Sequence, residues 1–504
     1  MVLTTVAVVP LAFSTWTIDV FNLTALTVLW LGTTVAWGLW VARHGLRIPA
    51  LPAMWPAVAL YVAVLIVATL ASRAPMVSFL GSYGRYGGLV TIVPAIALAW
   101  LFADGVGRSR RHRRQALVAL ALSGALGATY LWSQELGIDA WGWLEPWDQP
   151  PRHPPGALGN SNFSGAHLAI ASMPALALAA QSRGRHRVVW GAAAALVLSG
   201  VAVSQSRGAM MAVGAGLIVL AAGRSTKRTL VVGAVVVGAA VGLVALATND
   251  GGSDELFGTR TWDERLDLWE VALRGAADRP VLGGGPDLFR LTFEEHAGPE
   301  LSGVISDEAH NVLLDHLDGA GFLGAAAWLG VVAAAAATAR RREDRSVTVW
   351  TATGAAYLAQ AMVSIDVVPL VLWGWVALGG VAATGVGAPR PRGPSSVRVP
   401  IAAVATVVVC LVALGPFRAD MAHRRGIEAS NAADVDRALF QLEQATDRHG
   451  WEPRFHRRLG IQLVLASRAG DDAFAERAEA ELRRALDLYP GDPIAEEWLA
   501  LVEG

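Results

Sequence analysis

The stretch Asp-Glu-Ala-His-Asn at residues 307–311 sets an imidazole just before a long apolar run that begins near Val312. At neutral pH a histidine side chain can accept or donate a proton, so His310 is a candidate catalytic residue. The preceding acids, Asp307 and Glu308, are expected to raise its pKa. Acids and asparagine also favour a helix N-terminus, so helix capping is the competing interpretation for this stretch, Asn311 included.

Four arginines stand in short motifs that could act beside this histidine. They are Arg85 in FLGSYGRYGG, Arg207 in SQSRGAM, and Arg260 and Arg265 in TRTWDERLDLW. Guanidinium groups bind phosphate oxygens through paired hydrogen bonds and keep their charge when partly desolvated. On one surface with His310 they would suit a lipid diphosphate as leaving group, with the histidine as base for an acceptor hydroxyl. Snorkelling to a membrane interface is the alternative for Arg85 and Arg207.

Other polar and aromatic residues are predicted to support this constellation. Asn160 and Asn162 in LGNSNFSG precede an apolar run and are equally suited to helix capping. Gln205 adds a polar group beside Arg207. Trp269 belongs to the stripe Trp262, Leu266, Trp269 and Leu273, which predicts an amphipathic helix on a membrane surface. The three glycines at 283–285 predict a turn that lets backbone approach a ligand or the bilayer closely.

Composition places these residues in a polytopic membrane protein. The chain has 504 residues, 54% hydrophobic and 16% charged, with a mean hydropathy of +0.43, outside the soluble norm. A net charge of -1, with basic residues spread over short loops, argues against a nucleic-acid partner. The single cysteine, Cys410, excludes a disulfide framework and a cysteine-based metal site. No paired acidic motif for a metal-bound diphosphate stands out, so neither a metal nor a cofactor is predicted.

Thirteen apolar stretches approach the roughly 20 residues that span a bilayer. They lie near residues 1–14, 20–42, 51–71, 87–103, 116–133, 163–181, 188–204, 209–222, 229–247, 312–338, 347–364, 367–385 and 399–416. The arginine-rich loops, such as GRSRRHRR and ARRREDR, alternate along the chain and are expected in the cytoplasm. The N-terminus is then cytoplasmic, whereas loop 248–311, with fourteen acids against five arginines, and the tail from 417 lie outside.

The tail, residues 417–504, has helical periodicity with interleaved charge and is predicted to be a small soluble α-helical unit. Its segments ATDRHGWEP and ALDLYPGDP end alike, with Pro453 and Pro493 forty residues apart. This spacing resembles a tetratricopeptide repeat with a short insertion. Two repeats are too few to stand alone, so either the tail packs on the membrane domain or it is a generic helical hairpin.

Several of these motifs occur in an order that resembles the bacterial O-antigen ligase and polymerase superfamily. They are LGNSNFSGAHLAIASMPALAL, SQSRGAMMAVGAGLIVLAAG, RLDLWEVALRGAADRPVLGGGPDLF and AHNVLLDHLDGAGFLG, over roughly residues 79–336. The resemblance implies an all-α bundle of about 12 to 13 spans over residues 1–416, of the GT-C-like class, in the bacterial plasma membrane. It also implies a metal-independent, inverting glycosyltransferase that moves a glycan from undecaprenyl diphosphate to a glycan, lipid or protein acceptor on the outer face.

Residue by residue, the resemblance implies that Arg207 and Arg265 hold the diphosphate and that His310 is catalytic or orients the acceptor. Arg260 and Arg85 join the diphosphate-binding set. A polymerase, a ligase and an O-oligosaccharyltransferase all remain open. A transporter or flippase of lipid-linked glycans is a different possibility, which would need ionisable residues at mid-bilayer depth and paired broken helices. A non-enzymatic envelope scaffold that recruits partners through its tail is another.

Overall fold

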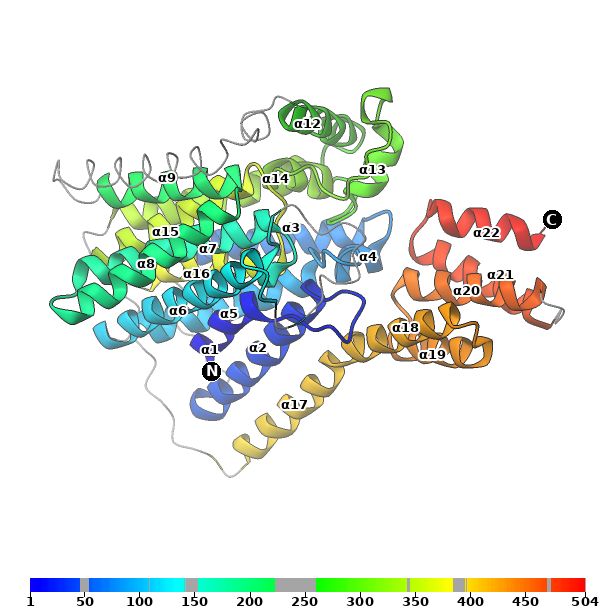
Figure 1. Cartoon of the computed structure of the whole chain (residues 1–504), viewed down its shortest axis with the longest axis horizontal. Coiled ribbons are helices and arrows are strands. Elements are labelled where there is room, and N and C mark those ends of the chain that lie inside the picture. Colours follow the sequence, from blue (N-terminus) through cyan, green and yellow to red (C-terminus); the bar gives the residue numbers. More distant parts are fainter. Residues whose placement is uncertain are drawn as a thin grey trace.

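The computed structural model describes residues 1–45, 54–107, 109–139, 141, 153–222, 260–341, 345–383, 395, 397–468 and 473–503. Throughout this part of the chain the regular elements are helices and no strand occurs. The predicted all-α class is therefore confirmed (Figure 1). The predicted span near 229–247 lies outside the described residues.

The membrane bundle is built from apolar helices, several of which begin at basic or capping residues. In chain order they are α1 (Val2–Val8), η1 (Val9–Leu11), α2 (Asn22–His44), α3 (Trp55–Leu70), α4 (Pro75–Leu80), α5 (Leu89–Gly107), α6 (Arg110–Glu135), η2 (Gly156–Leu158), α7 (Ser161–Gln181), α8 (Arg185–Val203), α9 (Arg207–Ala222), α14 (Val312–Arg340), α15 (Arg345–Ala361), α16 (Val368–Ala382) and α17 (Arg398–Ala413).

Seven of the described helices are long and apolar enough to cross a membrane: α2, α5, α6, α7, α8, α14 and the continuous helix Arg398–Asn431. Shorter apolar helices are Val2–Leu11, Trp55–Leu70, Arg207–Ala222 and Val368–Ala382. The predicted first span, 1–14, is thus only seven residues of α1 and three of η1, roughly half the length a bilayer needs. The protein is a multi-pass membrane protein.

Close packing of small residues holds the bundle together. Helix α16 lies against α5, and a Cβ added to Gly379 would come within 2.6 Å of the Ala99 carbonyl oxygen. Glycine at such a crossing lets two backbones approach where lipid supplies no hydrophobic drive for association. The large side chains Trp350 and Trp373 are fully buried in the same core.

A small helical cap covers one end of the bundle. It consists of α12 (Arg260–Asp278), α13 (Phe289–His296) and η3 (Pro299–Leu301). Leu268 and Val271 of α12 pack on Phe289 and Phe293 of α13 in a core of their own. The opposite stripe stays exposed, with Leu266 and Leu273 54% and 52% accessible. This exposure is consistent with the predicted amphipathic helix on a membrane surface.

The tail contains α18 (Gly415–Asn431), α19 (Val435–Arg448), α20 (Pro453–Arg468), α21 (Ala473–Leu488) and α22 (Pro493–Glu503). Pro453 and Pro493, the two prolines of the predicted repeat, each begin a helix. A core around Leu442, Leu463 and Leu482 joins the helices. The tail also contacts the membrane domain, as shown below, so of the two sequence alternatives the packed arrangement is found. Its relation to tetratricopeptide repeats stays a prediction.

Candidate functional site

Five of the predicted site residues line one cavity of about 410 Å³. The cavity lies at the end of the bundle where α2, α7 and α14 begin, the end that carries α12, α13 and the tail in Figure 1. The predicted residues in its wall are Arg85, Asn160, Asn162, Arg265 and His310. They come from four separate segments of the chain, which meet at one end of the bundle. Arg454 of the tail also lines this cavity, and sequence reasoning did not include it.

His310 is held by the start of α14. The next residue, Asn311, is the N-cap, and its side-chain oxygen accepts from the Leu313 and Leu314 amides at 3.0 and 3.3 Å. The capping role of Asn311 is therefore confirmed. His310 itself has φ of 57°, an uncommon conformation for a residue with a side chain. Among the described residues, no side-chain hydrogen bond engages its imidazole, which leaves both ring nitrogens available to a ligand.

Burial, followed by the charges of Arg265 and Arg85, lowers the pKa of His310 to about 4, although Asp307 acts in the opposite direction. The prediction that Asp307 and Glu308 raise the pKa of His310 is therefore wrong. Asp307 is paired with Arg85, and burial raises the pKa of Glu308 well above its usual value. At neutral pH the imidazole of His310 is uncharged and can accept a proton.

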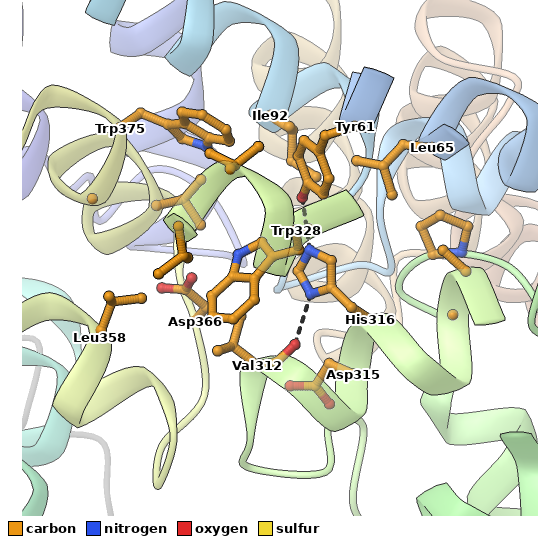
Figure 2. Close-up of a pocket in the computed structure, with 18 of the residues that line it drawn as sticks. Tyr61, Leu65, Ile92, Val312, Asp315, His316, Trp328, Leu358, Asp366 and Trp375 are labelled. Carbon is orange, nitrogen blue, oxygen red and sulfur yellow. Dashed lines mark hydrogen bonds between the residues drawn. The ribbon is translucent and has the colours of Figure 1, made fainter. Parts of the chain in front are cut away.

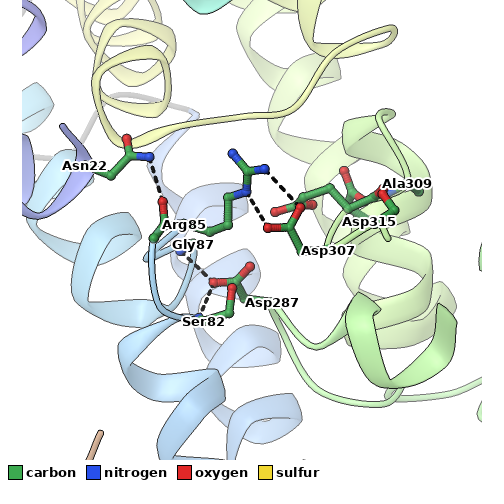
Figure 3. Close-up of polar contacts among 11 residues, drawn as sticks. Asn22, Ser82, Arg85, Gly87, Asp287, Asp307, Ala309 and Asp315 are labelled. Carbon is green, nitrogen blue, oxygen red and sulfur yellow. Dashed lines mark hydrogen bonds and ion pairs between the residues drawn. The ribbon is translucent and has the colours of Figure 1, made fainter. Parts of the chain in front are cut away.

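Arg85 and Asp307 form a two-point ion pair beside His310 (Figure 3). The Arg85 Nε donates to Oδ2 at 2.7 Å and Nη2 donates to Oδ1 at 3.0 Å. The guanidinium also lies 5.9 Å from the ring centroid of Phe163. Arg85 is therefore more than a snorkelling cation, because it ties the loop before α5 to the loop before α14.

Asp287 holds the backbone of the Arg85 loop in place, a role that sequence reasoning missed. Its Oδ2 accepts from the amides of Ser82 at 2.6 Å and Gly87 at 2.8 Å (Figure 3). On the other side of the loop, the Asn22 amide donates to the Gly84 carbonyl at 2.7 Å. Both contacts join segments far apart in sequence, so no local pattern could have indicated them.

Arg265 projects from α12, and Arg207 stands at the first position of α9. Helix α8 ends at Val203, and a short turn precedes Arg207. Burial, and after it the charge of Arg207, lowers the pKa of Arg265. The two cations are thus close enough to repel each other, and the positive end of the α9 dipole adds to the field.

The remaining predicted residues have varied surroundings. Arg260 begins α12, but its side chain lies outside the described residues. Asn160 is the N-cap of α7, and its side chain accepts from the Asn162 amide at 2.8 Å, so its capping role is confirmed. Gln205, in the turn before Arg207, has φ of 51°. Trp269 Nε1 is buried, and no partner for it occurs among the described residues.

The glycine turn at residues 283–285 packs closely against the backbone of α14. The sequence had predicted a close approach to a ligand or to the bilayer instead. Gly284 and Gly285 amides donate to the Asp318 and Gly319 carbonyls at 2.8 and 3.0 Å. At this point α14 is broken by Gly321, whose φ is 65°. The predicted span 312–338 is found as α14, with a break at Gly321 inside it.

A second, mainly apolar cavity lies among α3, α5, α14, α15 and α16 (Figure 2). His316 projects into it, and its Nδ1 lies 2.6 Å from the Val312 carbonyl while its Nε2 lies 2.7 Å from the Tyr61 hydroxyl. Since a carbonyl only accepts, Nδ1 carries the proton and Nε2 accepts from Tyr61. Asp287 and Glu308 also line this cavity, and the charges of Arg85 and Asp307 act on both. Sequence reasoning did not single out His316.

Fold and site together define a multi-pass helical membrane protein with an arginine- and histidine-lined cavity at one end. The O-antigen ligase family model matches residues 192–329. The match includes Arg207, Arg265 and His310, whereas Arg85 and Asn160 lie outside it. The match supports a relationship of this part of the chain to the O-antigen ligase/polymerase family and a ligase- or polymerase-like role in glycan assembly. Among curated proteins no match was found.

Proposed function

We propose that this protein transfers a glycan from an undecaprenyl-diphosphate carrier to an acceptor hydroxyl on the outer face of the plasma membrane. The observation that carries the proposal is the convergence of Arg265, His310 and Arg85 on one cavity, with two of the three inside the matched family domain. The arginine-rich loops at the other end of the bundle, including Arg110 and Arg340, support the orientation with this cavity outside.

Each of these residues has its own role in the proposed reaction. Arg207 and Arg265 bind the diphosphate and stabilise the negative charge that it gains as it leaves. The neutral His310 imidazole accepts the proton of the acceptor hydroxyl as its oxygen attacks the anomeric carbon. The new glycosidic bond forms on the face opposite the breaking bond to the diphosphate, so the configuration inverts. In this scheme the arginine side chains supply the positive charge, and the proposed reaction requires no metal or cofactor.

The neighbouring apolar cavity suits a lipid chain, either of the carrier or of a lipid acceptor. Its walls come from apolar helices, and Trp328 and Trp375 contribute aromatic surface (Figure 2). A hydrocarbon chain held there with its polar end near Glu308 and Asp287 would lie close to Arg85, whose charge acts on both carboxyl groups.

A reconstituted transfer assay tests the proposal. Full-length protein in proteoliposomes is supplied with lipid-linked glycan extracted from the source bacterium, and released undecaprenyl diphosphate and elongated or transferred glycan are measured. His310→Ala and Arg265→Ala should each lower the rate by about 100-fold or more. Arg274→Ala is the matched control, since Arg274 lies on the same helix and pairs with Glu270 away from the cavity. Unchanged release in both site variants would refute the proposal.

Deletion of the gene separates the possible acceptors. Surface chains shortened to single repeats would indicate a polymerase. Full-length chains left on the lipid carrier would indicate a ligase or a protein glycosyltransferase, and the mobility of envelope glycoproteins would distinguish these two.

A further inference from the structure

The tail is fixed to the membrane domain at two separate places. At the first, the fully buried Asp420 of α18 accepts from the Ile18 and Asp19 amides at 2.6 and 3.2 Å. The Tyr83 hydroxyl donates to the other oxygen of the same carboxylate. These bonds join the tail to the loop before α2 and to the loop that carries Arg85.

The second place lies at the other side of the tail. Tyr489, in the turn between α21 and α22, packs on a buried apolar cluster formed by Val77 of α4 and by Leu288 and Leu291 at α13. With both contacts made, the tail helices are held in a fixed position above the outer loops.

Between the two contacts lies a cleft of about 330 Å³, here called the tail cleft. One wall comes from the outer loops and includes Tyr83, Arg85, Arg290 and Asp307. The opposite wall comes from the tail, which contributes Trp451, Arg454, Arg457, Tyr489 and Asp492. The cleft therefore exists only because the tail is docked.

The chemistry of the tail cleft suits a saccharide. A sugar ring has apolar C–H faces, which pack on aromatic rings, and a rim of hydroxyls, which pair with charged donors and acceptors. Trp451 is 50% exposed although it is a large aromatic residue, and the guanidinium of Arg484 lies 6.0 Å from its ring centroid. Arg457 is paired with Asp492 at 2.5 Å, which supplies an arginine and a carboxylate side by side.

The tail cleft is continuous with the cavity that contains His310. Tyr83, Arg85 and Arg454 line both. The guanidinium of Arg454 lies 4.3 Å from the ring centroid of Tyr83, which fixes it at the junction. A chain of sugars in the tail cleft can therefore extend to the imidazole without leaving the protein surface.

We propose that the tail cleft is a saccharide-binding subsite, which holds sugar residues next to the bond that is made. This inference rests on the proposed function, and it adds that the tail is part of the binding site. The saccharide could belong to the donor glycan or to a glycan acceptor, which share this chemistry, and the experiment below separates the two.

Trp451→Ala tests the subsite, because its exposed side chain can be removed without opening a core. Phe440→Ala is the matched control, an equally exposed aromatic on α19 outside the tail cleft. The probe for direct binding is the oligosaccharide released by mild acid from the lipid-linked glycans of the source bacterium, titrated into full-length protein. Trp451→Ala should weaken binding by about tenfold, and Phe440→Ala should leave it unchanged.

Transfer kinetics then identify the source of the saccharide. An acceptor subsite predicts that Trp451→Ala raises the KM for the acceptor glycan alone, and a donor subsite predicts the same for the lipid-linked glycan alone. The direct titration is independent of transfer, so it tests the tail cleft even if the protein proves to catalyse no transfer. The proposal is overturned if wild-type protein binds no oligosaccharide, or if both aromatic variants bind it as the wild type does.

Discussion

Arg85 and Asp307, 222 residues apart in the chain, meet in a two-point ion pair that closes one side of the cavity around His310. Asp307 is three residues from the imidazole, so the pair determines where the loop before α14 lies. We regard Arg85 as a positioning residue through this contact, in addition to any contact it makes with a bound diphosphate.

Arg85→Ala and Asp307→Ala should each lower the transfer rate, and the double variant should lose no more than the more damaging single variant. The reason is that each substitution already breaks the same contact, so the effects are not additive. Arg73→Ala is the control, because Arg73 pairs with Glu295 between other outer loops. Fully additive losses in the double variant would show that the two residues act independently.

The fall of kcat/KM at acid pH, the acid limb of the pH profile, should reflect protonation of the His310 imidazole. With a pKa near 4 in the free protein, the imidazole is neutral above that pH, and kcat/KM should fall only as the pH approaches about 4. Arg265→Gln removes a charge that lowers this pKa, so it should move the limb to higher pH. Asp307→Asn removes a charge that raises it and should move the limb lower. Measured profiles that stay fixed or shift in the reverse sense would contradict this assignment.

The low pKa of His310 is a property of the site that could not be predicted from the sequence. Asn160 and Asn311 were predictable as helix caps because a cap depends on a few adjacent residues. The shared face of Arg85, Arg265 and His310 followed from the alternation of basic loops along the chain. The direction of the His310 pKa shift did not. Burial and then the charges of Arg265 and Arg85 lower this pKa, and all three depend on contacts with distant segments. The acids adjacent in sequence are paired or buried.

Contacts between distant segments explain the other differences. Asp287 was not singled out from the sequence, because its bonds to Ser82 and Gly87 depend on how α4 meets the cap. Arg454 lines the cavity because the tail docks through Asp420 on Tyr83 and on the loop before α2. Helical periodicity alone cannot give the position of a docked unit.

Asp287→Ala should destabilise the protein by about 1–3 kcal/mol, because it leaves two backbone amides without an acceptor. Asp287→Asn keeps an oxygen acceptor at the same place and should cost less. Burial raises the pKa of Asp287 to about 6. A raised folded-state pKa favours the fold while the group is protonated, so this contribution is lost as the pH rises through about 6. Thermal unfolding in detergent from pH 4 to 8 measures this, and the dependence should be weaker in the asparagine variant.

The break in α14 gives a test of the glycine turn that supports the site. Gly321 has φ of 65°, and a Cβ there would come within 2.3 Å of the Val281 backbone. The next residue, Phe322, donates its amide to the Pro280 carbonyl at 2.8 Å, so the break and the turn hold each other. Gly321→Ala should therefore cost more than the roughly 1–2 kcal/mol of a left-handed alanine, and it should reduce transfer by displacing the loop that carries Asp287.

Gly330 is the control within the same helix, because nothing lies within 4 Å of the Cβ that alanine would add there. Gly330→Ala should be neutral or stabilising by up to about 1 kcal/mol, since alanine favours the helix. The comparison separates the geometry of the break from glycine content as such. If Gly321→Ala unfolds at the same temperature as Gly330→Ala and retains transfer, α14 tolerates a straight path through Gly321. The glycine turn would then not be what positions Asp287.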